Sequence, residues 1–212
     1  MRAFLFDLDG TLIDSAEDIA LALRLTLEDL GLSERMPPDV RSFIGGGVRL
    51  LLERVLGDDF REEHVKVFRK HYISNPVVHT RPYPGIEETL KSLRERDFSL
   101  VVVTNKLEEL SLEILKRLGL LDLFDLVVGG DTFSEKKPSP LPVKKALEFI
   151  GVKPSSALMV GDTEADIRAG KGAGTLTALA LWGYVKNGAV EPDFFLKEPT
   201  ELLSLAYRGS GA

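Results

Sequence analysis

The stretch Ala3-Phe4-Leu5-Phe6-Asp7-Leu8-Asp9-Gly10-Thr11 decides the fold of this chain. Its first four residues are apolar, and the run ends abruptly at a carboxylate. A short apolar run of this kind is typical of a strand that is buried on both faces, as strands of parallel sheets are. The sequence therefore predicts a buried strand over residues 3–6, followed at once by a polar turn.

From residue 82 onward, helices alternate with apolar strands. Such alternation predicts a parallel sheet with helices on both sides, an α/β core of three layers resembling a Rossmann fold. The strand at 3–6 has no partner nearby in sequence and most simply joins that sheet. The predicted helices cover 86–96, 107–118, 140–150 and 163–173, and the predicted strands cover 100–103, 126–128, 157–160 and 176–181.

The segment 15–81 has a different pattern, with helical spacing and no stretch typical of a strand. Ile19, Leu23 and Leu27 recur at the spacing of one helix face, which predicts a helix over about 16–30. Two or three further helices are predicted between residues 38 and 74. We therefore predict a small all-helical unit at 15–81, inserted into a core formed by residues 1–14 and 82–212.

Composition excludes several classes of protein. The 212 residues contain no cysteine, which rules out disulfides, thiolate nucleophiles and Cys-ligated zinc. A net charge of −6 argues against broad nucleic-acid binding, which needs a basic face. There is no apolar run long enough for a membrane span and no secretory signal. These observations predict a cytoplasmic protein with no nucleic-acid or membrane partner.

Polar side chains follow each predicted strand at its carboxyl end. In an open parallel sheet, the functional site lies outside these ends, so we expect the side chains to converge. Carboxylates that lie close together repel one another unless a cation joins them, and an oxygen-only set suits Mg²⁺. A carboxylate can also attack phosphorus, and a second one nearby can serve as acid and base. The residues are Asp7, Asp9, Thr104, Asn105, Lys137, Asp162 and Asp166.

The order of these motifs resembles the phosphatase branch of the haloacid dehalogenase superfamily. The matching motifs are Phe6-Asp7-Leu8-Asp9-Gly10-Thr11, Val103-Thr104-Asn105, Lys137-Pro138-Ser139-Pro140 and Gly161-Asp162-Thr163 with Asp166. The resemblance spans essentially the whole chain, and the helical insertion at 15–81 resembles the family's small helical cap domain. The overall pattern is similar to phosphoglycolate phosphatases. It includes Ile44-Gly45-Gly46-Gly47 in the helical segment and Tyr83-Pro84-Gly85 where the core resumes.

The resemblance implies a role for each matching residue. Asp7 would be the nucleophile and Asp9 the general acid and base. Mg²⁺ would be held by a carboxylate oxygen of Asp7, the backbone carbonyl of Asp9, and Asp162. Asp166 would support the metal shell, through water.

The resemblance also implies that residues of the second and third motifs bind the transferring phosphoryl group. Thr104 and Asn105 would cradle it, and Lys137 would offset its charge. The neighbouring Lys136 competes for that role, but the proline after Lys137 favours Lys137.

Two of these features could have a purely structural role instead of a functional one. Thr163 and Asp166 have the spacing of a helix capping box, and this role is compatible with support of a metal. The triplet Gly45-Gly46-Gly47 could bind substrate or merely turn the chain between helices.

The expected activity is Mg²⁺-dependent hydrolysis of a small phosphate monoester, with 2-phosphoglycolate as the leading candidate. Pyrophosphate, a sugar phosphate or a nucleotide remains an alternative substrate, and a phosphomutase would share the motifs. A dehalogenase needs no second catalytic carboxylate, so Asp9 argues against it. A phosphate-sensing scaffold protein is the alternative outside enzymology. The sequence leaves open whether the protein is a monomer or a homodimer.

Overall fold

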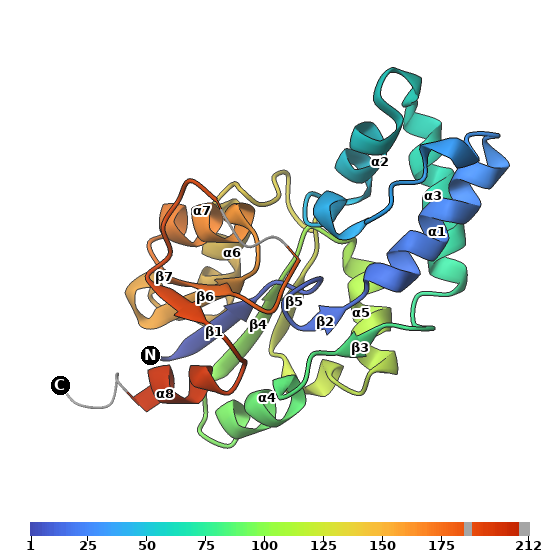
Figure 1. The fold of residues 1–212 in the computed structure, drawn as a ribbon. Coiled ribbons are helices and arrows are strands. Elements are labelled where there is room, and N and C mark those ends of the chain that lie inside the picture. The colour runs from blue at the N-terminus through green and yellow to red at the C-terminus, as the bar shows by residue number, and fades with distance from the viewer. Residues whose placement is uncertain (185–187, 208–212) are drawn as a thin grey trace.

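A six-stranded parallel sheet forms the centre of the computed structural model, which describes residues 1–184 and 188–207. The strand order is β5-β4-β1-β6-β7-β8, so β1 is central and pairs with β4 and β6 (Figure 1). The predicted parallel sheet is confirmed. The strands are β1 (Ala3–Phe6), β4 (Ser99–Val103), β5 (Leu126–Val128), β6 (Ala157–Gly161), β7 (Leu176–Ala180) and β8 (Phe194–Leu196).

Helices cover both faces of this sheet. On one face, α6 (Leu141–Ile150) and α7 (Glu164–Ala173) pack against the strands. The other face is covered by α4 (Ile86–Arg94), α5 (Glu108–Arg117) and α8 (Glu201–Tyr207). The fold is therefore the three-layer α/β arrangement that the alternating pattern predicts.

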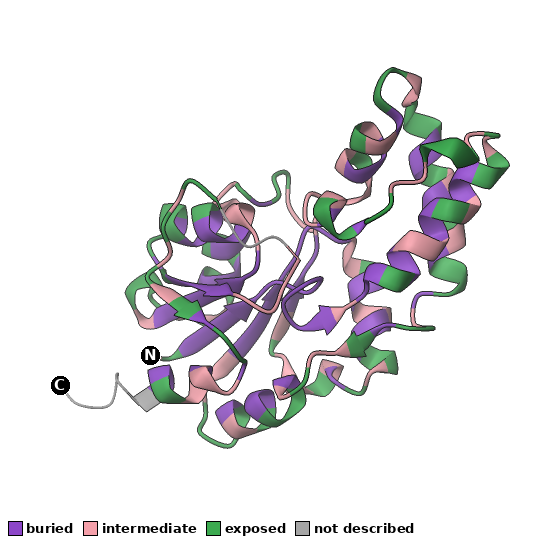
Figure 2. Cartoon of the chain, viewed as in Figure 1, coloured by how far each residue is buried: buried purple, intermediate pink, exposed green. Residues whose placement is uncertain are grey.

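The side chains of β1 explain why it occupies the centre. Ala3 and Leu5 point into the cluster under α6 and α7, whereas Phe4 and Phe6 point into the opposite cluster. All four residues are fully buried, as the purple centre of Figure 2 shows. Burying one large apolar side chain stabilises a fold by about 1.5–3 kcal/mol, so a strand that is apolar on both faces gains most in the middle of the sheet.

The helical segment lies beyond the carboxyl end of β1 (Figure 1). It contains α1 (Ala16–Asp29), α2 (Val48–Leu56) and α3 (Glu62–Ser74), and α3 contacts both α1 and α2. Short 3₁₀ turns at 33–35, 41–43 and 57–59 connect these helices. The assignment of 15–81 as a separate cap domain stays a prediction, and below we call this group of helices the helical segment.

A two-stranded antiparallel ladder joins the two ends of the helical segment. Here β2 (Ile13–Asp14) pairs with β3 (Arg81–Pro82). The prediction that 15–81 contains no strand is therefore wrong at Arg81. Strands of two residues carry no periodic pattern, which is why the sequence does not reveal them. The ladder holds the entry and exit of the helical segment side by side.

No helix in the described ranges, 1–184 and 188–207, combines the length and the apolar character needed to cross a membrane.

Asp18 secures the chain where the helical segment returns to the core. Its buried carboxylate accepts hydrogen bonds from the backbone N–H groups of Val78, His79 and Thr80 at 2.9–3.1 Å. The Thr80 hydroxyl donates another at 2.6 Å. Burial alone would raise the pKa of Asp18, but these hydrogen bonds outweigh it and lower the pKa below its usual value. The carboxylate thus replaces the partners that three consecutive backbone groups would otherwise lack.

Replacing Asp18 with alanine is expected to lower the free energy of unfolding by about 3 kcal/mol, because buried N–H groups lose a charged acceptor. Urea denaturation at pH 7 measures this, with Glu17→Ala on the same helix as the exposed control. Because the pKa is lower in the folded state, the stabilisation is present above the unfolded pKa and is lost as pH falls through the folded pKa. The difference between the two proteins should therefore shrink under acid. Equal stability of Asp18→Ala and Glu17→Ala at pH 7 would contradict this assignment.

Candidate active site

The turn after β1 brings its carboxylates to the edge of the sheet. The backbone N–H of Asp7 still donates to Val160 O at 2.9 Å, so Asp7 continues the ladder of β1. The next residues turn back, and Gly10 adopts a φ of 84°. A Cβ at Gly10 would lie 2.3 Å from Asp162 Oδ2. Glycine is therefore required there, both for the turn and for the close approach of the two loops.

Asp7 belongs to a cluster of three buried carboxylates. Carboxylate oxygens of Asp7, Asp162 and Asp166 lie within 4.8 Å of one another, although Asp7 follows β1, Asp162 follows β6 and Asp166 lies in the first turn of α7. The sequence predicts this convergence from the position of each residue after an apolar run, and the structure brings all three together. Their mutual repulsion in a buried site makes a bound cation strongly favourable.

Lys137 supplies one positive charge to this cluster. Its Nζ lies 2.8 Å from Asp7 Oδ1 and 2.6 Å from Asp166 Oδ1, and the side chain is almost fully buried. Burial alone would lower the pKa of Lys137, but Asp166 and Asp7 raise it. For Asp7, burial dominates and raises the pKa to about 7, while Lys137 opposes the rise. One lysine is therefore not enough to keep Asp7 fully ionised at neutral pH.

Asp162 is held in place from both sides. The Thr11 hydroxyl donates to its Oδ1 at 3.2 Å, and the backbone N–H of Tyr184 donates to its Oδ2 at 2.8 Å. Burial raises the pKa of Asp162 well above its usual value, and the nearby Asp7 and Asp166 raise it further. An oxygen-only set of this kind, short of positive charge, fits the preference of Mg²⁺. Asp7 and Asp162 are thus suited to hold the ion.

Asp166 has a structural role that the sequence also indicates. Its Oδ2 accepts hydrogen bonds from the backbone N–H and the hydroxyl of Thr163, at 3.0 and 2.6 Å. This is a capping box at the start of α7. Its other oxygen accepts the hydrogen bond from Lys137. Asp166 therefore both caps the helix and orients the lysine, and support of a metal shell remains a prediction.

Asp9 has two partners that the sequence analysis misses. The Ser15 hydroxyl donates to its Oδ1 at 2.5 Å, and Lys106 Nζ lies 3.0 Å from its Oδ2. Lys106 also donates to the Tyr72 hydroxyl on α3 at 2.8 Å. Burial alone would lower the pKa of Lys106, but Asp9 and Tyr72 more than offset it and raise the pKa. The sequence holds one signal for Lys106: it directly follows the motif Thr104-Asn105.

Thr104 and Asn105 lie at the carboxyl end of β4, beside this cluster. Thr104 Oγ1 accepts a hydrogen bond from the backbone N–H of Lys106 at 3.2 Å. Asn105 Nδ2 donates to the carbonyls of Gly45 and Lys137, each at 3.0 Å. The amide therefore ties the Lys137 loop to the helical segment. Binding of the phosphoryl group by Thr104 and Asn105 stays a prediction.

The glycine triplet contacts the edge of the core. Besides the contact between Gly45 and Asn105, Gly46 O accepts a hydrogen bond from Lys136 Nζ at 2.8 Å. Gly47 has a φ of 83°, and a Cβ there would lie 3.1 Å from Asn105 O. The triplet thus both turns the chain before α2 and closes over the second motif. A role in binding substrate stays a prediction.

The residues after β7 form a further part of the site that the sequence analysis misses. Trp182 Nε1 donates to Thr11 O at 2.9 Å. The Tyr184 hydroxyl donates to Asp14 Oδ1 at 2.8 Å and accepts from the backbone N–H of Ser15 at 2.7 Å. These contacts brace the loop that carries Asp7 and Asp9. The single tryptophan of the chain, placed just after the last predicted strand, is the sequence signal for them.

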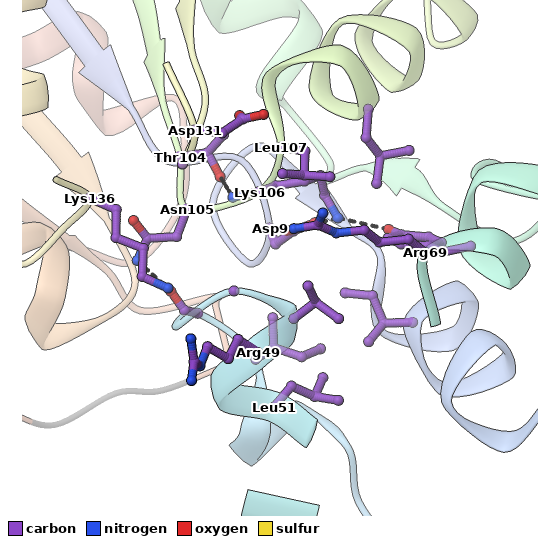
Figure 3. A pocket seen from close by; sticks show the side chains of 18 of the residues that line it. Asp9, Arg49, Leu51, Arg69, Thr104, Asn105, Lys106, Leu107, Asp131 and Lys136 are labelled. Atoms are coloured by element: carbon purple, nitrogen blue, oxygen red, sulfur yellow. Dashed lines mark hydrogen bonds and ion pairs between the residues drawn. The ribbon is translucent and has the colours of Figure 1, made fainter. Parts of the chain in front are cut away.

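A cavity of about 180 Å³ lies between the site and the helical segment (Figure 3). Its volume is below the roughly 300–1,000 Å³ of pockets that hold drug-sized ligands, so it suits a small metabolite. The core lines it with Asp7, Asp9, Thr104, Asn105 and Lys106, and the helical segment lines it with Ile44, Gly45, Gly47, Arg49, Phe68, Arg69 and Tyr72, among others.

Comparison with known proteins extends these observations. The family model of haloacid dehalogenase-like hydrolases matches residues 4–180. A phosphoglycolate phosphatase of Aquifex aeolicus (strain VF5) is 64% identical, over 97% of this chain and 96% of that protein. One of Neisseria gonorrhoeae (strain ATCC 700825 / FA 1090) is 43% identical, over 87% of this chain and 81% of that protein. These matches confirm the resemblance that the motifs indicate.

Solved structures agree with this result. The crystal structure of a predicted phosphoglycolate phosphatase from Haemophilus somnus 129PT superposes with a TM-score of 0.87 and 31% identity. The superposition covers 97% of this chain and 98% of that one. Because the family match includes the loops after β1, β4 and β6 that carry the clustered side chains, the chain belongs to the family of haloacid dehalogenase-like hydrolases.

Proposed function

We propose that this protein is a Mg²⁺-dependent phosphatase that hydrolyses 2-phosphoglycolate to glycolate and phosphate through a phosphorylated Asp7. The observation that carries the proposal is the position of Asp7. It is a buried carboxylate beside Lys137 and Asp162, and it lines a small cavity that Asp9 also lines. The names of the relatives support 2-phosphoglycolate as the substrate.

The two carboxylates on the loop after β1, Asp7 and Asp9, would have separate roles in the reaction. An oxygen of Asp7 forms a bond to phosphorus while the bond from phosphorus to the ester oxygen breaks, and Asp9 gives its proton to that oxygen. In the second half, Asp9 takes a proton from water as the water oxygen attacks phosphorus. The bond between phosphorus and Asp7 then breaks, which frees phosphate and returns Asp7 to a carboxylate and Asp9 to its protonated form.

The remaining residues of the site would stabilise charge and orient the reacting groups. Lys137 would stabilise the negative charge on the phosphoryl oxygens as it shifts in the transition state. Asp7 and Asp162 would hold Mg²⁺, together with the backbone carbonyl of Asp9, and Asp166 would support the shell. When bound, the ion would neutralise the carboxylates and polarise the phosphoryl group. Ser15 and Lys106 orient Asp9 for both proton transfers.

The helical segment lines one side of the cavity, and its closure over the site would exclude water from the reaction. We propose that it acts as a cap, with the β2–β3 ladder as the place where its two connections are held. The substrate would be a small phosphorylated metabolite in the cytoplasm.

A phosphate-release screen tests the proposed function. Purified protein is incubated with 2-phosphoglycolate, pyrophosphate, a hexose 1-phosphate and a nucleoside monophosphate, each with saturating Mg²⁺. The highest kcat/KM is expected for 2-phosphoglycolate. Transfer of the phosphoryl group to a second sugar hydroxyl instead of water would establish the phosphomutase alternative, and absence of turnover on every ester would contradict the proposal.

Replacing Lys137 with methionine is expected to lower kcat by roughly 10²–10³-fold, because the site loses a preorganised charge beside the reacting group. The same substitution at Lys136 is the matched control, since that side chain is exposed and donates to Gly46 O rather than to a carboxylate of the site. Phosphate release under saturating substrate compares the two variants. A loss that is larger for Lys136→Met than for Lys137→Met would mean that the wrong lysine is assigned.

A further inference from the structure

Arg69 on α3 is a cation for which the described part of the chain offers no partner. It forms no hydrogen bond or ion pair with any residue in the described ranges, and its Nε is buried. Figure 3 shows its side chain extending from α3 across the cavity toward Asp9 and Lys106. A partly buried guanidinium group loses hydration, and this loss costs free energy. The cost is offset only when a hydrogen-bond acceptor occupies the space in front of the group.

The other cations that line the cavity already have partners. Arg49 pairs with Glu53 of α2 and with Glu62 at the start of α3. Lys106 is engaged by Asp9 and Tyr72, and Lys136 donates to the backbone of the glycine triplet. Among the residues that the structure describes, Arg69 is therefore the cavity-lining cation left for a ligand.

The surroundings of Arg69 favour an anion over a neutral group. Phe68 and Tyr72, its neighbours on α3, and Leu110 of the core give the cavity apolar walls. A charge-assisted hydrogen bond is stronger in such surroundings than in water. The planar guanidinium can also hold both oxygens of a carboxylate at once.

The placement of Arg69 relative to Asp9 limits the length of the ligand. In the proposed reaction, Asp9 protonates the ester oxygen, so this oxygen lies next to Asp9. Arg69 extends toward Asp9, so the anion that it binds must follow the ester oxygen closely. A phosphate ester with its carboxylate one carbon from the ester oxygen meets this requirement.

We propose that Arg69 binds the carboxylate of the substrate and makes the enzyme selective for short phosphate monoesters that carry one. This assignment rests on the proposed function and adds a specificity-determining residue that the motifs do not include.

Paired substrates test the role of Arg69. The value of kcat/KM is measured for 2-phosphoglycolate and for ethyl phosphate, which has the same carbon chain without the carboxylate. Arg69→Ala is expected to lower kcat/KM for 2-phosphoglycolate by about 10- to 100-fold, the range expected when a charged hydrogen bond is lost. For ethyl phosphate, the change should stay below about 3-fold.

Two further variants separate specificity from stability. Lys66→Ala removes an exposed cation from the same helix and should leave both substrates unaffected. Arg69→Lys keeps the charge but loses the bidentate geometry, so its activity on 2-phosphoglycolate should lie between wild type and Arg69→Ala. Added guanidinium ion should partly restore Arg69→Ala on 2-phosphoglycolate alone. Equal losses on both substrates, or no loss on 2-phosphoglycolate, would overturn the assignment.

A binding measurement distinguishes failure of this inference from failure of the proposed function. Calorimetric titration of 2-phosphoglycolate into Asp7→Asn, with and without Arg69→Ala, requires no turnover. The Kd should rise by about 10- to 100-fold when Arg69 is absent. An unchanged Kd would reject the role of Arg69, even if the wild-type enzyme hydrolyses the ester. A raised Kd together with an inactive wild type would support Arg69 and reject the proposed reaction.

Discussion

Replacing Asp7 with asparagine is expected to lower phosphate release by at least about 10⁴-fold, because the amide cannot form the bond to phosphorus. The substitution keeps the size of the side chain, so β1 and its packing should remain intact. Its neighbours Asp162 and Asp166 lose a like charge, whereas Lys137 loses one of its two partners. These effects oppose each other, and the change in Tm should therefore be small.

Acid-quenched reactions with labelled substrate give a second measurement for Asp7. Wild-type protein should retain phosphate bound to the chain, and Asp7→Asn should retain none. Asp122→Asn serves as the control, because that carboxylate lies exposed in the turn at 121–123. If Asp7→Asn turned over substrate at the wild-type rate, or if labelled phosphate remained on it, another residue would be the nucleophile.

The central part of the fold can be predicted from apolar runs that are visible in the sequence. The apolar runs at 3–6, 100–103 and 157–160 are too uniformly apolar for loops, and a polar side chain follows each run within two residues. Asp7, Thr104 and Asp162 follow the carboxyl ends of neighbouring strands, and this position brings them near one another. This step needs only the geometry of a parallel sheet.

Other elements carry no such pattern. The ladder of β2 and β3 has two residues on each strand, and its pairing of Asp14 with Arg81 joins positions that are far apart in sequence. The third missed strand, β8, is a short edge strand in which Phe195 is exposed, so it lacks the continuous apolar run of the inner strands. Short, half-exposed segments acquire their structure from tertiary contacts.

The missed side chains of the site are also tertiary features. Lys106 and Asp9 form an ion pair across 97 positions of sequence, and Tyr184 reaches Asp14 across 170. Neither lysine nor tyrosine is unusual near a strand end, so residue type alone does not select them. That Arg69 has no partner among residues 1–184 and 188–207 is likewise visible only in the three-dimensional structure.

Removing Mg²⁺ with a chelator is expected to lower kcat by roughly 10⁴-fold, since a metal ion contributes several kcal/mol of stabilisation to such a transition state. The structure gives a second reason. Without the ion, burial raises the pKa of Asp7 to about 7, so part of the nucleophile is protonated at neutral pH. Added Mg²⁺ should restore the activity. Ca²⁺, which prefers longer bonds and looser geometry, should restore much less. Activity that survives chelation would contradict the metal assignment.

Thermal stability tests the same metal site without turnover. A ligand that binds only the folded state raises Tm, so Mg²⁺ should stabilise the wild type but not Asp162→Ala. The ion competes with protons for Asp7 and Asp162, whose pKa values are both raised, chiefly by burial. Mg²⁺ should therefore bind more tightly at pH 8 than at pH 6, and the increase in Tm at a fixed Mg²⁺ concentration should be larger at pH 8. An increase of equal size in Asp162→Ala would place the ion elsewhere, and an increase that is larger at pH 6 would mean that the protonated carboxyls are not its ligands.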